Sequence, residues 1–523
     1  MGCEARIGSP TFPEPDPTSF HSRYAPEREA ARHVRACIGS KRPAIVYIIG
    51  GGMGYIHEAV SELLPRARLV SLQPCDLFHA HELGKPAITW RPGVAEPLES
   101  VLARSLADGR MAGGVSVIEW TPVTRRFTAQ SERIRLALRD ALESASSDAA
   151  TSAYWSAGWL RNAARFAAAA RRQVRIRNGD GPIVIACAGP SLMRFLPELS
   201  RRRDDIALWA LASAVPALVA AGLTPDLAVA TDPGFWNALH LRTITELGIP
   251  IALSPSAFAT EDALYRCPIL ALDTGLPFER AAVEAAGFED HRCSASGSAA
   301  GTALSLALAC TGGPVTLAGY DLAAFGHEDH CRPYPFDSLD LALASRTRPV
   351  TSAGASRTFD GYQAAVGAWR LSRAFSAYAL SIRPPLGDSA RAFRLSDSPV
   401  PTPVPRIARL DDLPPTRGEP PVVTPLDDGS RDSSLDSAAI RREGYLDRVS
   451  SSLEASLAGA TEALASSVPM PFDAMTVYRA LAPEATAPLV ASMARGEATE
   501  RELLAVHSAA EQALFSMRGG CDG

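Results

Sequence analysis

Short apolar runs alternate with helical stretches through the middle of this chain, between residues 180 and 385. Each run is too short for a buried helix and leads into small or turn-forming residues, as parallel strands buried on both faces do. Strands that alternate with helices in this way predict a doubly wound α/β sheet. The expected strands are Ile183–Ala186, Ile206–Leu211, Leu227–Ala230, Ile249–Leu253, Ile269–Leu272 and Val315–Leu317.

A similar pattern over residues 41–175 predicts a first α/β domain. Its expected strands are Ala44–Ile49, Leu69–Leu72 and Val115–Ile118. The first strand runs into Gly50-Gly-Gly-Met-Gly54, which resembles the nucleotide-binding turn of dinucleotide domains. Such a turn needs an acidic residue after the next strand to bind ribose hydroxyls, and Gln73 stands there instead. We therefore expect a Rossmann-like scaffold without a bound cofactor.

A proline-rich segment and a helical region follow the two α/β domains. Residues 386–435 mix Pro with Asp and Ser, a composition typical of a linker without regular structure. Beyond it, Leu453, Leu457 and Leu464 lie at helical spacing. The sequence thus predicts two Rossmann-like doubly wound α/β domains plus a C-terminal helical tail. The expected boundaries are 1–40 for an N-terminal arm and helix, 41–175 and 176–385 for the two domains, 386–435 for the linker and 436–523 for the helical region.

Charge and cysteine content exclude several classes of protein. The formal net charge of −5 gives no general attraction to nucleic acid or to anionic lipid. Nine scattered cysteines contain no Cys-x-x-Cys pair, which argues against a structural zinc site and a disulfide framework. The uncharged window 206–223 is interrupted by Pro216 and indicates a strand and a helix, not a membrane span. We expect a cytoplasmic protein that does not bind nucleic acid and does not span a membrane.

Two small-residue turns in the second domain are suited to binding an anion. Gly189-Pro190-Ser191 follows the first strand, where a glycine permits close backbone approach and free N–H groups favour phosphate. Ser296, Gly297 and Ser298 open the helix that runs to Cys310, and its first turn also presents N–H donors and hydroxyls. Both turns are therefore candidate phosphate sites.

Acidic and histidine residues follow the same strands. Asp232 ends the strand Leu227–Ala230, and Asp321 comes two residues after Gly319 at the end of another strand. Carboxylates at this edge can bind sugar hydroxyls or a divalent ion. His327 and His330 lie in the next loop, and a histidine near neutrality can act as a general acid or base.

Together these motifs resemble the motility-associated factor (Maf) glycosyltransferases, whose shared domain is named for the MptE-like 6-hydroxymethylpterin diphosphokinases. The resemblance rests on four elements in order: Gly189-Pro-Ser-Leu192, the run from Gly222 to Asp232, Ser296-Gly-Ser-Ala-Ala300 and Gly319-Tyr-Asp-Leu-Ala323 with His330. Three of them also resemble the small bacterial sialyltransferases that use CMP-activated sugars. The similarity covers roughly residues 20–385.

The resemblance implies transfer of a nonulosonic acid from a CMP-sugar donor to Ser or Thr of flagellin or another protein acceptor. It assigns catalysis to His330 and Asp232. It assigns donor binding to Gly189, Pro190, Ser191, Ser296, Gly297, Ser298, Gly319 and Asp321. The CMP-sugar enters as a donor substrate, and Mg²⁺ is the one candidate cofactor.

Two alternatives remain open from the residues. One is a diphosphokinase that binds ATP at the same edge, with Asp226 and Asp232 holding Mg²⁺ for phosphoryl transfer. The other is a non-catalytic nucleotide-binding module of the same fold. Asp226 is also explained by ordinary turn chemistry, since it closes a Thr-Pro-Asp sequence.

Overall fold

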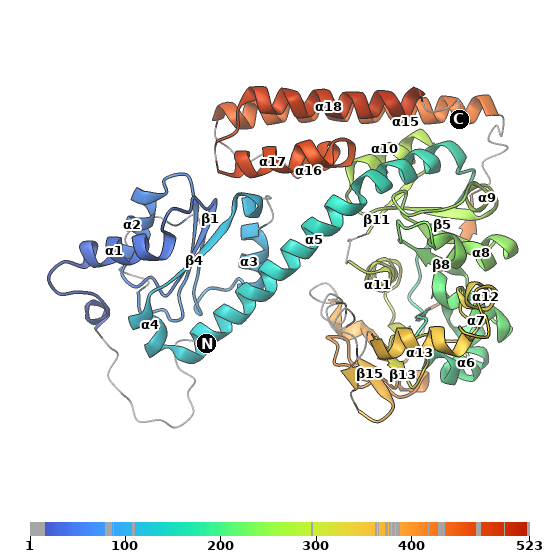
Figure 1. The fold of residues 1–523 in the computed structure, drawn as a ribbon. Coiled ribbons are helices and arrows are strands. Elements are labelled where there is room, and N and C mark those ends of the chain that lie inside the picture. The colour runs from blue at the N-terminus through green and yellow to red at the C-terminus, as the bar shows by residue number, and fades with distance from the viewer. Residues whose placement is uncertain are drawn as a thin grey trace. The chain divides into compact units, whose positions relative to one another are not determined.

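A computed structural model shows that the chain forms two compact units. Unit 1 comprises Met1–Ala157 and Ser450–Gly523, and unit 2 comprises Gly158–Val449. The helices α5 (Thr128–Ala169) and α15 (Leu435–Ser466) contain the two points at which the chain passes between units (Figure 1). The structure describes residues 16–78, 86, 88–106, 110–293, 297–360, 363–364, 366–371, 375, 378, 382, 388–416, 418–426, 435–466, 472–495 and 497–519.

Unit 1 is built on a four-stranded parallel sheet in the order β3-β2-β1-β4. This order, with β1 between β2 and β4, is that of a Rossmann half. The strands are β1 (Ile45–Ile49), β2 (Arg68–Leu72), β3 (Ile88–Trp90) and β4 (Val115–Glu119). The helices in this unit, besides parts of α5 and α15, are α1 (Pro26–Ile38), α2 (Tyr55–Leu63), α3 (Leu98–Leu106), α4 (Thr121–Arg126), α16 (Phe472–Leu481), α17 (Pro483–Ala494) and α18 (Glu500–Gly519), with short 3-10 turns η1 (Pro17–Phe20) and η2 (Arg110–Gly113).

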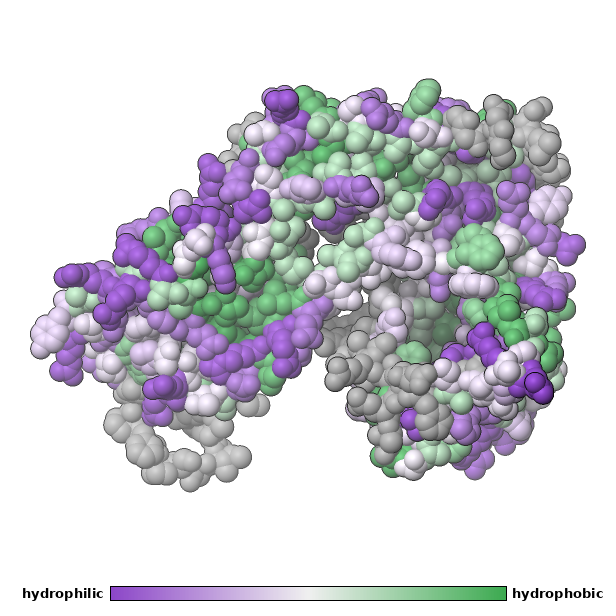
Figure 2. Space-filling view, in the orientation of Figure 1, coloured by the Kyte–Doolittle hydropathy of each residue, from purple (hydrophilic) through white to green (hydrophobic). Residues whose placement is uncertain are grey.

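The C-terminal helices are integral to unit 1. A side chain on Gly113, at the end of η2, would lie 2.6 Å from the Cβ of Ala494 on α17. The expected helical tail is therefore helical, but it packs against the first α/β domain. No helix among the described residues is long and apolar enough to cross a membrane. Figure 2 shows hydrophilic and apolar residues mixed on the visible surface of α18.

The glycine-rich turn after β1 is filled by the protein's own side chains. A side chain on Gly52 would collide with the ring of His21, and one on Gly51 would collide with His57. The backbone N–H of Met53 donates to Nε2 of His21 at 3.2 Å, and the ring of His21 stacks on Trp120. The small residues of this turn thus accommodate internal packing.

Unit 2 contains an eleven-stranded sheet whose central strands are parallel. Along the sheet the order is β17-β16-β12-β6-β7-β8-β9-β10-β5-β18, with β11 also paired to β10. All six expected strands are present. The strands are β5 (Arg172–Arg177), β6 (Ile183–Ala186), β7 (Ala207–Leu211), β8 (Leu227–Ala230), β9 (Ile251–Leu253), β10 (Pro268–Asp273), β11 (Asp290–Arg292), β12 (Val315–Ala318), β16 (Ala392–Leu395), β17 (Arg406–Ile407) and β18 (Val422–Pro425).

Helices and a small second sheet complete unit 2. The helix α11 (Ala299–Cys310) packs against β6, β7 and β8 and is buried along most of its length. The other helices are α6 (Leu192–Arg201), α7 (Val215–Ala220), α8 (Asn237–Leu247), α9 (Glu261–Arg266), α10 (Pro277–Ala285), α12 (Asp337–Ala342) and α13 (Val350–Asp360). The small antiparallel sheet consists of β13 (Ala323–Phe325), β14 (Gln363–Ala364) and β15 (Trp369–Leu371).

The proline-rich segment is not an unstructured linker, and that expectation was wrong. It supplies β16 beside β12, β17 beside β16, and β18 antiparallel to β5. Ala392 and Leu395 of β16 are fully buried. The strands nearest the prolines, β17 and β18, are the two edges of the sheet. An edge strand tolerates proline because one side of its backbone needs no ladder hydrogen bonds.

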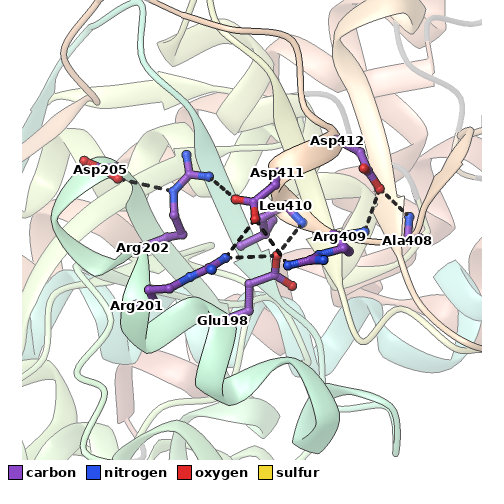
Figure 3. Close-up of polar contacts among 9 residues, drawn as sticks. All are labelled: Glu198, Arg201, Arg202, Asp205, Ala408, Arg409, Leu410, Asp411 and Asp412. Carbon is purple, nitrogen blue, oxygen red and sulfur yellow. Dashed lines mark hydrogen bonds and ion pairs between the residues drawn. The ribbon is translucent and has the colours of Figure 1, made fainter.

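A group of charged residues fastens this segment to α6 and the turn that follows it (Figure 3). Arg201 and Arg202 donate to the carboxylate of Asp411 at 3.0 and 2.8 Å. The backbone N–H of Leu410 donates to Glu198 at 2.9 Å, and Asp412 accepts from the N–H of Arg409. The short turns involved are η3 (Arg203–Asp205) and η6 (Leu410–Asp412), and a further turn, η5 (Ser389–Arg391), precedes β16.

Candidate functional site

The sheet of unit 2 changes direction between β6 and β12. From β6 the chain proceeds outward through β7, β8, β9 and β10, and then returns to add β12 and β16 on the other side of β6. In open α/β sheets ligands bind beyond the carboxyl ends of the strands at such a reversal. Gly189-Pro190-Ser191 follows β6, and Gly319-Tyr320-Asp321 follows β12. Two of the expected turns therefore meet at the favoured position.

The glycines of these turns allow them to cross. The N–H of Gly189 donates to the carbonyl of Gly319 at 3.0 Å. A side chain on Gly189 would collide with that carbonyl and lie 2.6 Å from Oδ2 of Asp321. Gly319 has a φ of +71°, and a side chain there would lie 2.6 Å from the carbonyl oxygen of Cys187. Both glycines are thus explained by internal packing, whether or not a ligand approaches.

Asp321 lies beneath the Gly-Pro-Ser turn, not on its open side. Its side chain is buried, with 1% of the residue exposed. One carboxylate oxygen accepts from the N–H of Ser191 at 2.7 Å, and the other accepts from the Ser191 hydroxyl at 2.5 Å and from the Ser396 hydroxyl. Burial raises the pKa of Asp321, and these hydrogen bonds oppose the shift. Asp321 therefore supports the turn from within, and its role in donor binding stays a prediction.

Arg394 completes this support, although no sequence pattern singled it out. It lies on β16, in the segment expected to be a linker, and is 2% exposed. Its guanidinium donates to the carbonyls of Tyr320 at 2.7 Å and Val400 at 2.6 Å and to the hydroxyl of Ser396 at 3.1 Å. Its positive charge also compensates the buried carboxylate of Asp321.

The second small-residue turn opens α11 at the same edge of the sheet. Ser298 is the N-cap residue, and its hydroxyl accepts from the N–H of Gly301 at 3.2 Å. Gly297 adopts a φ of +70° with open space where a side chain would lie. Because α11 leads into the parallel strand β12, its N-terminus faces the carboxyl edge, where Ser191 also lies. Ser296 lies outside the described residues.

Asp226 and Asp232 lie at opposite ends of β8, so they do not form a shared metal site. Asp226 accepts from Arg203 at 2.5 Å and from the N–H of Leu208 at 2.8 Å at the amino end of the strand. Asp232 is exposed at the carboxyl end and accepts from the N–H of Gly234. No cluster of three metal-binding side chains occurs within the described ranges.

The loop after β12 carries His330 back to the end of β6. The N–H of Cys331 donates to the carbonyl of Ala188 at 2.9 Å. The ring of His330 stacks on Tyr334, with centroids 4.0 Å apart and planes at 18°. His327, three residues earlier, is exposed. Of the two candidate histidines, His330 is the less exposed one and stacks on an aromatic ring.

A third histidine, His240 on α8, joins this group. Its ring lies 5.9 Å from Tyr334 and 5.3 Å from Phe336. Burial lowers its pKa to about 4, with a further decrease from His330 and an opposing effect from Asp232. His240 is therefore neutral near pH 7 and lies within electrostatic reach of both expected catalytic residues. The sequence analysis did not select His240, because its importance comes from contacts with residues of the loop after β12.

Aromatic rings extend from His330 toward solvent. Tyr334 contacts Phe336, and Phe336 lies 6.1 Å from Trp236, which contacts Phe235. Phe235 and Trp236 are 67% and 55% exposed and directly follow the Asp232 turn. The carboxyl edge thus combines the N-terminus of α11, an imidazole, and exposed aromatic faces at β8.

Residues 159–326 match the family described as 6-hydroxymethylpterin diphosphokinase MptE-like. This span contains β6 to β12 and both small-residue turns. It confirms the MptE-like domain that the motifs indicated.

Two further proteins are similar to the chain. An uncharacterized protein of Treponema pallidum (strain Nichols) is 26% identical over 258 residues, which cover 49% of this chain. The match spans only 57% of that relative's length. The solved structure of the MAf glycosyltransferase from Magnetospirillum magneticum AMB-1 aligns with 94% of this chain and 83% of its own chain, at 13% identity and a TM-score of 0.48.

Proposed function

We propose that the chain is a Maf-type glycosyltransferase that moves a nonulosonic acid from a CMP-activated donor to a Ser or Thr hydroxyl of flagellin. The observation that carries this proposal is the stacked imidazole of His330 beside the reversal point of an MptE-like sheet. An anionic group suits the N-terminus of α11 at that edge, and His330 is a side chain that can transfer a proton near neutral pH.

The donor phosphate would lie against Ser191 and the first turn of α11. The N-terminus of α11 favours negative charge there, because the first N–H groups of a helix have no partner within it. At α6 the N–H of Ser191 is already bonded to Asp321. The net charge of the protein is −5, so attraction of the donor depends on these local groups. Asp321, Ser396 and Arg394 keep the Gly-Pro-Ser turn in shape for this contact.

The proposed chemistry needs one proton acceptor and one leaving group. The acceptor oxygen forms a bond to the anomeric carbon while the bond from that carbon to the phosphate oxygen breaks. CMP leaves with the electron pair, and the hydroxyl proton passes to His330. Asp232, exposed at the end of β8, would bind hydroxyl groups of the transferred sugar. The faces of Phe235 and Trp236 offer apolar contact to an acceptor.

A diphosphokinase is the second candidate, favoured by the description of the matching family. It requires Mg²⁺ on the nucleotide phosphates. The pair Asp226 and Asp232 does not serve that purpose, because β8 separates them. A diphosphokinase function would therefore need metal ligands other than the expected pair of aspartates.

Ligand-induced thermal stabilisation, followed by product analysis, distinguishes the candidates. A ligand that binds the native state raises its stability by mass action, by about 2.7 kcal/mol at one hundred times its dissociation constant. We expect CMP and a CMP-nonulosonate to raise the melting temperature and the latter to modify purified flagellin. Stabilisation by Mg-ATP with phosphorylation of 6-hydroxymethylpterin would instead establish the diphosphokinase. Stabilisation by none of these ligands would contradict both.

A further inference from the structure

The loop that carries His330 also contains a buried carboxylate, Asp329. Its side chain is 6% exposed. Oδ2 of Asp329 accepts from Nε of Arg357 at 3.1 Å, and the same guanidinium donates to Asp340 at 2.8 Å. Arg357 lies on α13 and Asp340 on α12, so two helices outside the loop fix this carboxylate.

The second oxygen of Asp329 faces the imidazole of His330. Within the described residues, Oδ1 of Asp329 and Nδ1 of His330 are both buried, and neither makes a well-aligned hydrogen bond. The two atoms lie 3.3 Å apart. Arg332 lies farther from Oδ1, at 4.0 Å, and its guanidinium is paired with Asp337. A buried carboxylate oxygen without a donor is unfavourable, so a small rotation of the ring that directs Nδ1–H at Oδ1 stabilises both groups.

Asp329 is an anion at neutral pH. Burial would raise its pKa, but the contact with His330 and the charge of Arg357 outweigh burial and hold the pKa at about 2. An ionised carboxylate accepts hydrogen bonds and cannot donate them. It therefore favours the imidazole tautomer with the proton on Nδ1, which leaves the lone pair of Nε2 free. The stacked ring of Tyr334 restricts the plane of the imidazole.

We propose that Asp329 is a positioning residue for His330 and holds the imidazole in the tautomer whose Nε2 accepts the proton of the acceptor hydroxyl. This inference rests on the proposed role of His330 as the base. Asp329 itself touches neither donor nor acceptor. Arg357 supports it by fixing the carboxylate from α13.

The tautomer of His330 can be measured without any substrate. Nitrogen-15 chemical shifts of the full-length, histidine-labelled protein at alkaline pH report which ring nitrogen carries the proton, and the signals of His330 are those lost in His330→Ala. We expect the proton on Nδ1 in the wild-type protein. In Asp329→Asn the amide can donate to Nδ1, so the proton should move to Nε2. A proton on Nε2 in the wild-type protein would overturn the proposal even if the variant failed to fold.

A kinetic comparison tests the consequence for transfer. With a CMP-nonulosonate and purified flagellin, Asp329→Asn should lower kcat by about 10²- to 10⁴-fold, the range for lost general-base help, with little change in the donor KM. Glu328→Gln removes the same charge from an exposed position on the same loop and should remain close to wild type. Equal kcat in Asp329→Asn and Glu328→Gln would contradict the proposal. If no form transfers sugar, the proposed function fails, whereas the tautomer measurement still decides the role of Asp329.

Discussion

At the scale of single residues, the most direct contrast lies between His330 and His327, which share one loop. His330 stacks on Tyr334 near the end of β6, whereas His327 is exposed. His330→Ala should lower turnover by about 10²- to 10⁴-fold because it removes the base, with CMP affinity nearly unchanged. His327→Ala should have little effect. Steady-state transfer rates and CMP titrations measure both, and full activity in His330→Ala would refute the mechanism.

Acidification should destabilise the protein through His57. This residue is 1% exposed, and burial lowers its pKa to about 4 from its ordinary value of 6.5. Between these two values the unfolded state binds more protons, so stability falls as the pH falls, by up to about 3 kcal/mol near pH 4. Melting temperatures between pH 7 and pH 4.5 should therefore fall less steeply for His57→Gln than for the wild-type protein. Identical slopes would rule out this contribution.

Residues whose role depends on a strand end could be predicted from the sequence. Ser191 and Asp232 were selected as candidates because each follows a recognisable apolar run, and His330 was selected through the resemblance to the Maf motifs. Asp329 and Arg394 were not found, since their importance comes from contacts with Arg357 and with the Asp321 turn, both remote in sequence. A buried charge is recognisable only when its compensating partner is known.

At the scale of elements, the turns after β6 and β12 should be far less tolerant of substitution than the turn before α11. Gly319 and Gly297 have nearly the same φ, +71° and +70°, but only Gly319 faces backbone at 2.6 Å. Gly297→Ala should cost about 1–2 kcal/mol, the backbone penalty alone. Gly319→Ala should cost more, because the carbonyl of Cys187 must move. Chemical denaturation measures the free energy of unfolding of both variants. Equal losses would mean that the turns after β6 and β12 can move apart at little cost.

The central strands could be predicted, and the edge strands could not. Strands β6 to β10 and β12 are apolar on both faces, which gives a continuous signal. By contrast, β5 is rich in charged residues and directly follows a long helix, so no strand was predicted there. The strands β16, β17 and β18 lie among prolines and pair with partners far away in sequence. The local amino-acid composition does not reveal pairing between strands that are distant in sequence.

At the scale of the whole molecule, the C-terminal helices should stabilise unit 1 and not the candidate site. Residues from Ser450 onward belong to the same compact unit as Met1–Ala157, and α17 packs against η2. Removing residues 450–523 should lower the melting temperature of unit 1 and leave stabilisation of unit 2 by CMP intact. Calorimetry with and without CMP can separate the two transitions. Loss of the CMP effect in this truncation would show that binding depends on the C-terminal helices.

The division of the chain also sets an order for its synthesis. Unit 1 is discontinuous, and the whole of unit 2, Gly158–Val449, is inserted between its two parts. A ribosome therefore delivers every residue of unit 2 before it delivers α16, α17 and α18. The first α/β domain must wait through that interval with the surface that these helices cover still open to solvent. A chain that ends at Val449 would hold every residue of unit 2 and an unfinished unit 1, so we expect unit 1 to complete its folding last.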